Sequence, residues 1–233
     1  MGNDTMGLAE LASLLRRDQR ELDKLASRGR LPGKKVGGHW RFANAEIQQW
    51  LESEMRGFDE EQLKNIEDAH PEPSEPLLTQ LLAPDCVEVP LQARTAASVV
   101  RAMVRLAEQS WQVYDPEAVL AAVQSREEQA STAQDNGVAI LHPHRPLAAT
   151  LGESVVAFGR TAGGVPFGAS RGGLTDLFFL VCCRDQKTHL RVLARLSRLF
   201  LRPDFLDQLR AAETAADALH VIRDAEAKLL AEE

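Results

Sequence analysis

Two histidines follow a short apolar run in the sequence NGVAILHPHRP, which spans residues 136–146. The apolar residues 138–141 are enough for a buried strand, and His142, His144 and Arg145 come directly after them. A neutral imidazole nitrogen can accept a proton, bind a metal ion or accept a phosphoryl group, and a guanidinium can neutralise phosphate oxygens. The pattern therefore indicates a polar site at the edge of a sheet.

Four interpretations of His142, His144 and the distant His189 remain open from residue types alone. They are structural histidines, zinc ligands, the base of a hydrolase or acceptors of a phosphoryl group. We expect no metal, because no Asp, Glu or Cys at ligand spacing accompanies the histidines. The segment FGASRGG (167–173) is not the Gly-x-Ser-x-Gly elbow of a hydrolase. A phosphoryl acceptor needs cationic donors around three oxygens, which Arg126, Arg145 and His189 would supply if the fold gathers them.

The elements around these histidines predict an α/β body over residues 77–233. Strands are expected at 137–141, 154–161 and 174–183, with loops at 162–168 and 169–173. Amphipathic helices are expected at 95–110, at 115–130 with Asp115 as cap, and at 187–201, followed by two more near 203–212 and 215–230. A mixed sheet flanked by helices on both faces fits this order.

Residues 1–53 predict a small winged helix-turn-helix domain. After a first helix, Asp18 and Glu21 are spaced as a capping box for a second helix that ends at Gly29. Gly37 and Gly38 then join two short strands, and Asn44 is placed to cap a third helix. Residues 14–41 hold nine basic and three acidic side chains, a net charge of +6. Such a domain suits nucleic acid.

The rest of the chain has a different charge. The whole sequence carries a net charge of −7, and residues 54–76 hold eight acidic and two basic side chains. We predict that residues 54–76 form an acidic linker, helical at most in its first half. The longest apolar run, 177–183, is far shorter than the ~20 residues of a membrane span, and no signal peptide is recognisable. The sequence therefore predicts a cytoplasmic protein without membrane insertion.

The first domain resembles the excisionase-type winged helix-turn-helix, which is related to the MerR DNA-binding domain. Gly29-Arg30-Leu31-Pro32 and the segment VGGHWRF (36–42) carry the resemblance. It implies a DNA-binding surface formed by the recognition helix and the wing: Gln19, Arg20, Lys24, Arg28, Lys34, Lys35, His39 and Arg41. One departure is Asp23, where relatives carry β-branched or aromatic residues. A carboxylate there would weaken contact with phosphates or select cytosine.

The body resembles the enzyme IIA domain of the phosphoenolpyruvate-dependent phosphotransferase system, of the mannitol, fructose and nitrogen-regulatory type. The resemblance rests on SREEQASTAQDNGVAILHP (125–143), VPFGASRGGLTDLFFLVC (165–182) and DQKTHLRVLARLSRLF (185–200). It implies that His142 is the phosphoacceptor, with His189 as the second active-site histidine and Arg126 as the neutralising arginine. The proline that precedes the family's acceptor is Leu141 here, so His144, which follows Pro143, is the alternative acceptor.

The combination of the two domains predicts a bacterial regulator linked to the phosphotransferase system. A phosphocarrier of the HPr type would phosphorylate His142, adding roughly two negative charges and altering DNA occupancy by the first domain. No cofactor is expected beyond the covalent phosphoryl group. The alternative is a phosphocarrier, or a docking domain without phosphoryl transfer, whose first domain binds a protein partner.

Overall fold

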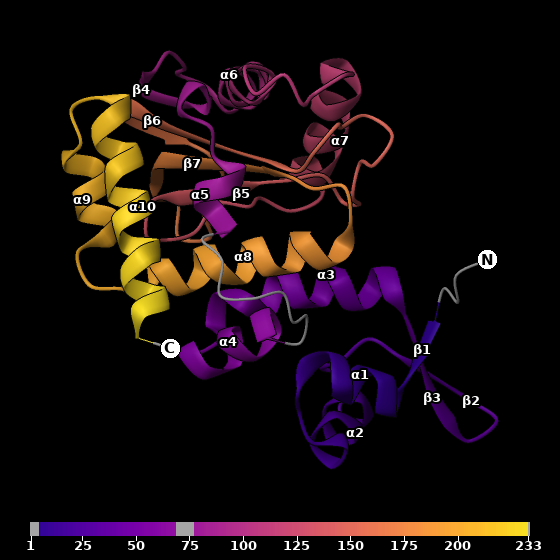
Figure 1. Ribbon diagram of the computed structural model, residues 1–233. Helices are drawn as coiled ribbons and strands as arrows, with labels where there is room; N and C mark the ends of the chain where they lie inside the picture. The colour runs from indigo at the N-terminus through magenta and orange to yellow at the C-terminus, as the bar shows by residue number, and fades with distance from the viewer. Residues whose placement is uncertain (1–4, 69–76, 233) are drawn as a thin grey trace. The chain divides into compact units, whose positions relative to one another are not determined.

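The computed structural model describes residues 5–68 and 77–232. The chain divides into two compact units, residues 1–72 and 73–233. Figure 1 shows the elements of each unit. Across the described residues, no helix has the length and apolarity needed to cross a membrane.

The first unit is a winged helix-turn-helix. Its elements are β1 (Thr5–Gly7), α1 (Leu8–Leu15), α2 (Gln19–Ser27), β2 (Lys34–Val36), β3 (His39–Ala43), α3 (Asn44–Glu54), the 3₁₀ turn η1 (Met55–Gly57) and α4 (Glu60–Asp68). The three strands form an antiparallel sheet in the order β1-β3-β2. Leu11, Leu22 and Phe42 are fully buried in this unit.

The local signals in this unit are mostly realised. The Asp18 carboxylate caps α2 by accepting from the backbone N–H groups of Arg20 and Glu21, and Gly29 ends the helix with φ of 70°. Gly37 and Gly38 both have positive φ, which a tight turn between twisted strands requires. The prediction of Asn44 as a helix cap is wrong. Helix α3 begins at Asn44 itself, and Ala43 occupies the cap position.

Part of the predicted acidic linker, residues 54–76, is structured. Helix α4 places Leu63 and Ile66 in the interior, where both are buried. The Arg16 guanidinium donates from Nη2 to the carbonyl of Asp68 at 2.6 Å and pairs with its carboxylate at 3.4 Å. Four acidic side chains, Glu60, Glu61, Glu67 and Asp68, therefore lie on a helix that packs against α1, and residues 69–76 of the predicted linker lie outside the described residues.

The second unit is built on a four-stranded mixed sheet. Its elements are α5 (Leu77–Leu81), the 3₁₀ turn η2 (Pro84–Cys86), β4 (Val87–Leu91), α6 (Ala96–Glu108), α7 (Pro116–Gln129), β5 (Val138–Leu141), β6 (Val155–Pro166), β7 (Leu174–Cys182), α8 (Gln186–Phe200), α9 (Phe205–Ala211) and α10 (Ala215–Ala231). The strand order is β4-β6-β7-β5. Strand β6 runs parallel to β4 and antiparallel to β7, and β5 runs parallel to β7.

Helices cover both faces of this sheet, as the sequence predicted. Figure 1 shows α6 and α7 over one face and α8 beneath the other, with α9 and α10 at one end. Strand β4 was not predicted from the sequence, because Pro90 interrupts its apolar pattern. A proline fits this strand because β4 lies at the edge of the sheet. Residues 162–166, expected to be loop, extend β6 past an irregularity in its pairing with β7.

A buried carboxylate holds the start of the second unit in place. Glu226 on α10 is fully buried, and its Oε1 accepts from Arg195 Nη1 on α8 at 3.0 Å. The same carboxylate accepts from the backbone N–H groups of Leu78 and Thr79, at 2.7 and 2.8 Å. One side chain therefore ties α5 to the helices α8 and α10.

We predict that Glu226→Ala destabilises the second unit by about 3–5 kcal/mol, because it leaves a buried guanidinium and two amides without their acceptor. The free energy of unfolding, from denaturant titration followed by circular dichroism, measures the loss. The matched control is Asp224→Ala on the same helix, where the exposed ion pair with Lys228 should matter little. Equal effects of the two substitutions would contradict the assigned role of Glu226.

Candidate functional site

His142 lies at the carboxyl end of strand β5. The four residues of this strand are all buried, and they pair in parallel with β7 up to Leu141 opposite Leu180. The His142 side chain turns back on the strand, so that its Nδ1 lies 2.8 Å from the carbonyl oxygen of Ile140. A carbonyl oxygen can only accept, so this contact assigns a proton to Nδ1, and in the neutral ring this leaves the lone pair on Nε2.

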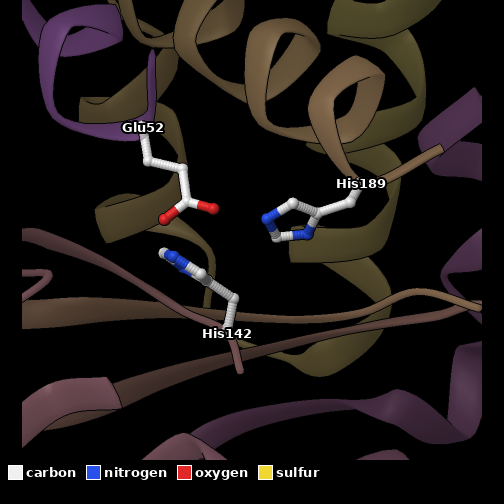
Figure 2. Close-up of side chains that lie close together, drawn as sticks. All are labelled: Glu52, His142 and His189. Atoms are coloured by element: carbon white, nitrogen blue, oxygen red, sulfur yellow. The ribbon is translucent and has the colours of Figure 1, made fainter. Parts of the chain in front are cut away.

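His189 comes from a separate element and meets His142 on the same side of the sheet. It lies in the first turn of α8, and the centroids of the two imidazole rings are 5.2 Å apart with an interplanar angle of 54°. Figure 2 shows the two rings directed into the same small space. The structure therefore brings together two histidines that are 47 positions apart in the sequence.

Both rings are buried, with exposed fractions of 4% for His142 and 2% for His189. Burial strengthens electrostatic interactions within the site, because less water screens them.

Arg126 lies in the last turn of α7 and is buried. Its Nη1 donates to the carbonyl of Ala130 at 2.8 Å, which holds the guanidinium at the end of its own helix. Its contact with a phosphoryl group stays a prediction. His144 is part-buried in the segment that follows His142. The ring contact of His189 is with His142, which favours His142 over His144 as the reacting histidine.

Sequence reasoning assigned no role to two residues that fix the loop between α7 and β5. The Glu127 carboxylate accepts from the backbone N–H of Thr132 at 2.9 Å and from its hydroxyl at 2.7 Å. Ser131 donates from its hydroxyl to the carbonyl of Phe167. The Arg-Glu and Ser-Thr pairs in the sequence were the available signal. Their hydrogen bonds hold the loop that leads from Arg126 to the strand of His142.

The cap of helix α8 sets the place of His189. Asp185 accepts from the backbone N–H and from the hydroxyl of Thr188, each at 2.8 Å. Burial by itself would raise the pKa of the Asp185 carboxyl, but these hydrogen bonds outweigh it and hold the pKa below its usual range. The residue before His189 is thus fixed by the charged form of Asp185.

We predict that Asp185→Ala lowers the free energy of unfolding by about 1 kcal/mol at neutral pH, because the first turn of α8 loses its cap. Because folding lowers the pKa of Asp185, its contribution is present above a pH of about 4 and is lost as pH falls through the folded-state pKa. Denaturant titrations of both proteins across this pH range measure the difference. Asp185→Asn keeps an acceptor oxygen and should lose less, and a difference that does not change with pH would contradict the prediction.

The predicted DNA-binding residues lie on one helix and one hairpin of the first unit. Gln19, Arg20 and Lys24 are on α2, and Arg28 follows it at its C-cap. The other four are on the strands of the wing, β2 and β3. All eight are exposed: Gln19, Arg20, Lys24, Arg28, Lys34, Lys35, His39 and Arg41. The surface is therefore available to a polyanion.

Asp23 has a structural partner that the sequence did not reveal. Its Oδ1 accepts from the indole Nε1 of Trp40 at 2.7 Å, which ties the helix α2 to the wing. The ammonium of Lys35 lies 5.0 Å from the centroid of the same indole ring, and the rings of Trp40 and Phe42 stack at 5.9 Å. The Asp23 carboxylate thus positions the wing.

Comparisons with known proteins assign a family to each unit. Residues 80–225 match the family described as phosphoenolpyruvate-dependent sugar phosphotransferase system, EIIA 2. Residues 5–55 match the family described as helix-turn-helix domain. Both matches confirm the resemblances found in the sequence.

Individual relatives cover mainly the second unit. The fructose-specific EIIABC component of Bacillus subtilis (strain 168) is 29% identical over 147 residues, which are 62% of this chain but only 23% of that protein. The fructose-specific EIIA component of Haloferax volcanii is 30% identical over 132 residues, 56% of this chain and 84% of that protein. The crystal structure of the nitrogen regulatory protein IIA-Ntr from Neisseria meningitidis shares the fold, with a TM-score of 0.57 and 22% identity over 63% of this chain and 99% of that one.

Proposed function

This chain belongs to the EIIA 2 family of the phosphoenolpyruvate-dependent sugar phosphotransferase system, and on this basis we propose that it is a regulator whose DNA-binding domain responds to phosphorylation of His142. The observation that carries the proposal is the pairing of His142 with His189 in a chain that also holds a basic winged helix-turn-helix. The donor is a phosphocarrier of the HPr type.

The hydrogen bond to Ile140 supports Nε2 of His142 as the acceptor atom. With the proton fixed on Nδ1, the lone pair of Nε2 attacks the phosphorus of the carrier's phosphohistidine. The new Nε2–P bond forms as the carrier's N–P bond breaks, and the bonding electrons of that bond return to the carrier's nitrogen. The ring of phosphorylated His142 gains positive charge, which strengthens the hydrogen bond from Nδ1 to the carbonyl.

His189 and Arg126 are proposed to stabilise the transferring group. An N–H of the His189 ring, one imidazole away, can donate to a phosphoryl oxygen, and the Arg126 guanidinium contributes positive charge from the end of α7. The Asp185 cap and the Glu127–Thr132 hydrogen bonds serve as positioning contacts for the elements that carry these groups.

The first unit is proposed to bind DNA through α2 and the wing. A helix of this size fits the major groove, and a basic hairpin beside it can neutralise phosphates or enter the minor groove. The exposed cations on α2 and the wing support this interpretation. In this proposal the two units are coupled. If phosphorylation changes the affinity for DNA by a given factor, bound DNA changes the equilibrium constant of phosphorylation by the same factor.

We predict that incubation of the full chain with phosphoenolpyruvate, enzyme I and the HPr-type carrier yields an acid-labile, base-stable adduct at Nε2 of His142. Mass spectrometry and ³¹P NMR detect the adduct and identify the nitrogen. His142→Ala should abolish it, because the acceptor atom is lost, and His189→Ala should slow its formation while His144→Ala leaves it intact. Loss of the adduct in His144→Ala but not in His142→Ala would make His144 the acceptor.

For DNA binding, we predict that the logarithm of affinity falls linearly with the logarithm of salt concentration, because phosphate contacts release counterions. Lys24→Ala should weaken binding and reduce the slope by about one. Electrophoretic shifts of genomic fragments over a salt series give the measurement, and Lys228→Ala, an exposed lysine of α10, is the matched control.

The absence of any shift at low salt would favour the alternative, in which the first unit binds a protein partner. The adduct at His142 and the DNA shift are independent readouts. Phosphoryl transfer without DNA binding would leave the chain as a phosphocarrier.

A further inference from the structure

The outward face of α6 and α7 carries apolar groups that the second unit does not cover. Residues 118–123 of α7 read AVLAAV, but only Val119 and Val123 among them are buried. Leu120 is part-buried and Ala121 is exposed. This six-residue stretch is apolar on every side of the helix, although the last two turns of α7 are polar, and such a stretch is typical of an element with neighbours on all sides. The outward side of α7 therefore lacks the neighbour that its sequence predicts, within the described residues.

The loop that joins these two helices adds two exposed aromatic rings. Trp111 is 85% exposed and Tyr114 is 70% exposed. Trp111 also has a φ of 61°, a left-handed conformation that is strained for a bulky side chain. Backbone hydrogen bonds hold both sides of this loop, from Trp111 to Glu108 and from Tyr114 to Thr150. A strained backbone that leaves an indole in solvent indicates a role outside the packing of this unit.

A groove of about 440 Å³ lies between α6 and α7. Val104, Pro116 and Leu120 supply its apolar lining. Its charged rim is self-complementary. Arg101 lies in the middle of α6, Arg105 and Glu108 lie in its last turn, and Glu117 lies in the first turn of α7, so the rim holds two charges of each sign.

We propose that the α6–α7 face, formed by residues 101–120, is the surface on which a second copy of this chain docks. A two-fold interface brings the same surface of both copies together, so that a basic residue of one copy can contact an acidic residue of the second copy, and the reverse contact forms as well. If the two α6 helices cross antiparallel, Arg105 of one copy lies opposite Glu108 of the second copy. Leu120 in the groove and the exposed Trp111 in the connecting loop then add apolar contact to these charge pairs.

The position of this face separates a second copy from the phosphocarrier as occupant. Helices α6 and α7 cover one face of the sheet, and α8, which carries His189, covers the other (Figure 1). A carrier must reach Nε2 of His142 beside His189, so it has no reason to bind the groove. The two kinds of partner can therefore be bound at once.

A dimer would hold two helix-turn-helix domains, one from each copy, and both could bind DNA. Helix-turn-helix dimers bind two half-sites about one helical turn apart, and each additional phosphate contact steepens the salt dependence. This consequence rests on the proposed function. The docking of a second copy does not, because it is measured without DNA.

Sedimentation velocity of the full chain over a concentration series tests the proposal. We expect a monomer–dimer equilibrium, and the double variant Trp111→Ser/Leu120→Asp should raise the dissociation constant about tenfold or more. Arg105→Glu and Glu108→Arg should each weaken the dimer, and the two together should restore it, because the swapped charges meet again across the two-fold axis. Circular dichroism establishes that the variants stay folded.

Leu174→Ser is the matched control, because Leu174 is exposed to 57% but lies on β7, outside the α6–α7 face. It should leave the dissociation constant unchanged. A chain that stays monomeric at all concentrations, or a dimer that Trp111→Ser/Leu120→Asp does not weaken, would overturn the proposal. A dimer without any DNA shift would uphold the interface and count against the proposed function alone.

Discussion

The hydrogen bond between His142 Nδ1 and the carbonyl of Ile140 is the constraint on which the site depends. Strand β5 is buried and paired along its length with β7, so this carbonyl is fixed in position. The hydrogen bond assigns the proton to Nδ1 and orients the ring toward His189 in the first turn of α8. Main-chain geometry thus orients this ring, which is the property that the proposed phosphoryl acceptor requires.

The supporting elements work through short, local contacts. Asp185 caps the helix of His189, and Glu127 holds the loop before β5. Farther away, the buried Glu226 ties α5, α8 and α10 together. In the first unit, Asp23 joins helix α2 to the wing through Trp40. In each case a carboxylate orients a neighbouring element through a hydrogen bond or an ion pair.

Much of the fold follows from local sequence signals. Asp18, Asp115 and the glycines at 37 and 38 encode helix starts and a turn through their own hydrogen bonds and φ preferences. Long periodic segments such as α6 and α8 were found for the same reason. The strand β4 was missed, and Asn44 was misplaced by one position, because Pro90 and the end of β3 are governed by the sheet around them.

The sequence by itself determined most of the helices and strands and pointed to the side chains that are chemically suited to a site, because caps, turns and apolar periodicity act within a few residues. Only the tertiary structure decided which of those side chains meet. The pairing of His142 with His189, of Asp23 with Trp40 and of Glu226 with Arg195 each joins segments at least 17 positions apart. Such contacts arise from the packing of whole strands and helices, which no local pattern specifies.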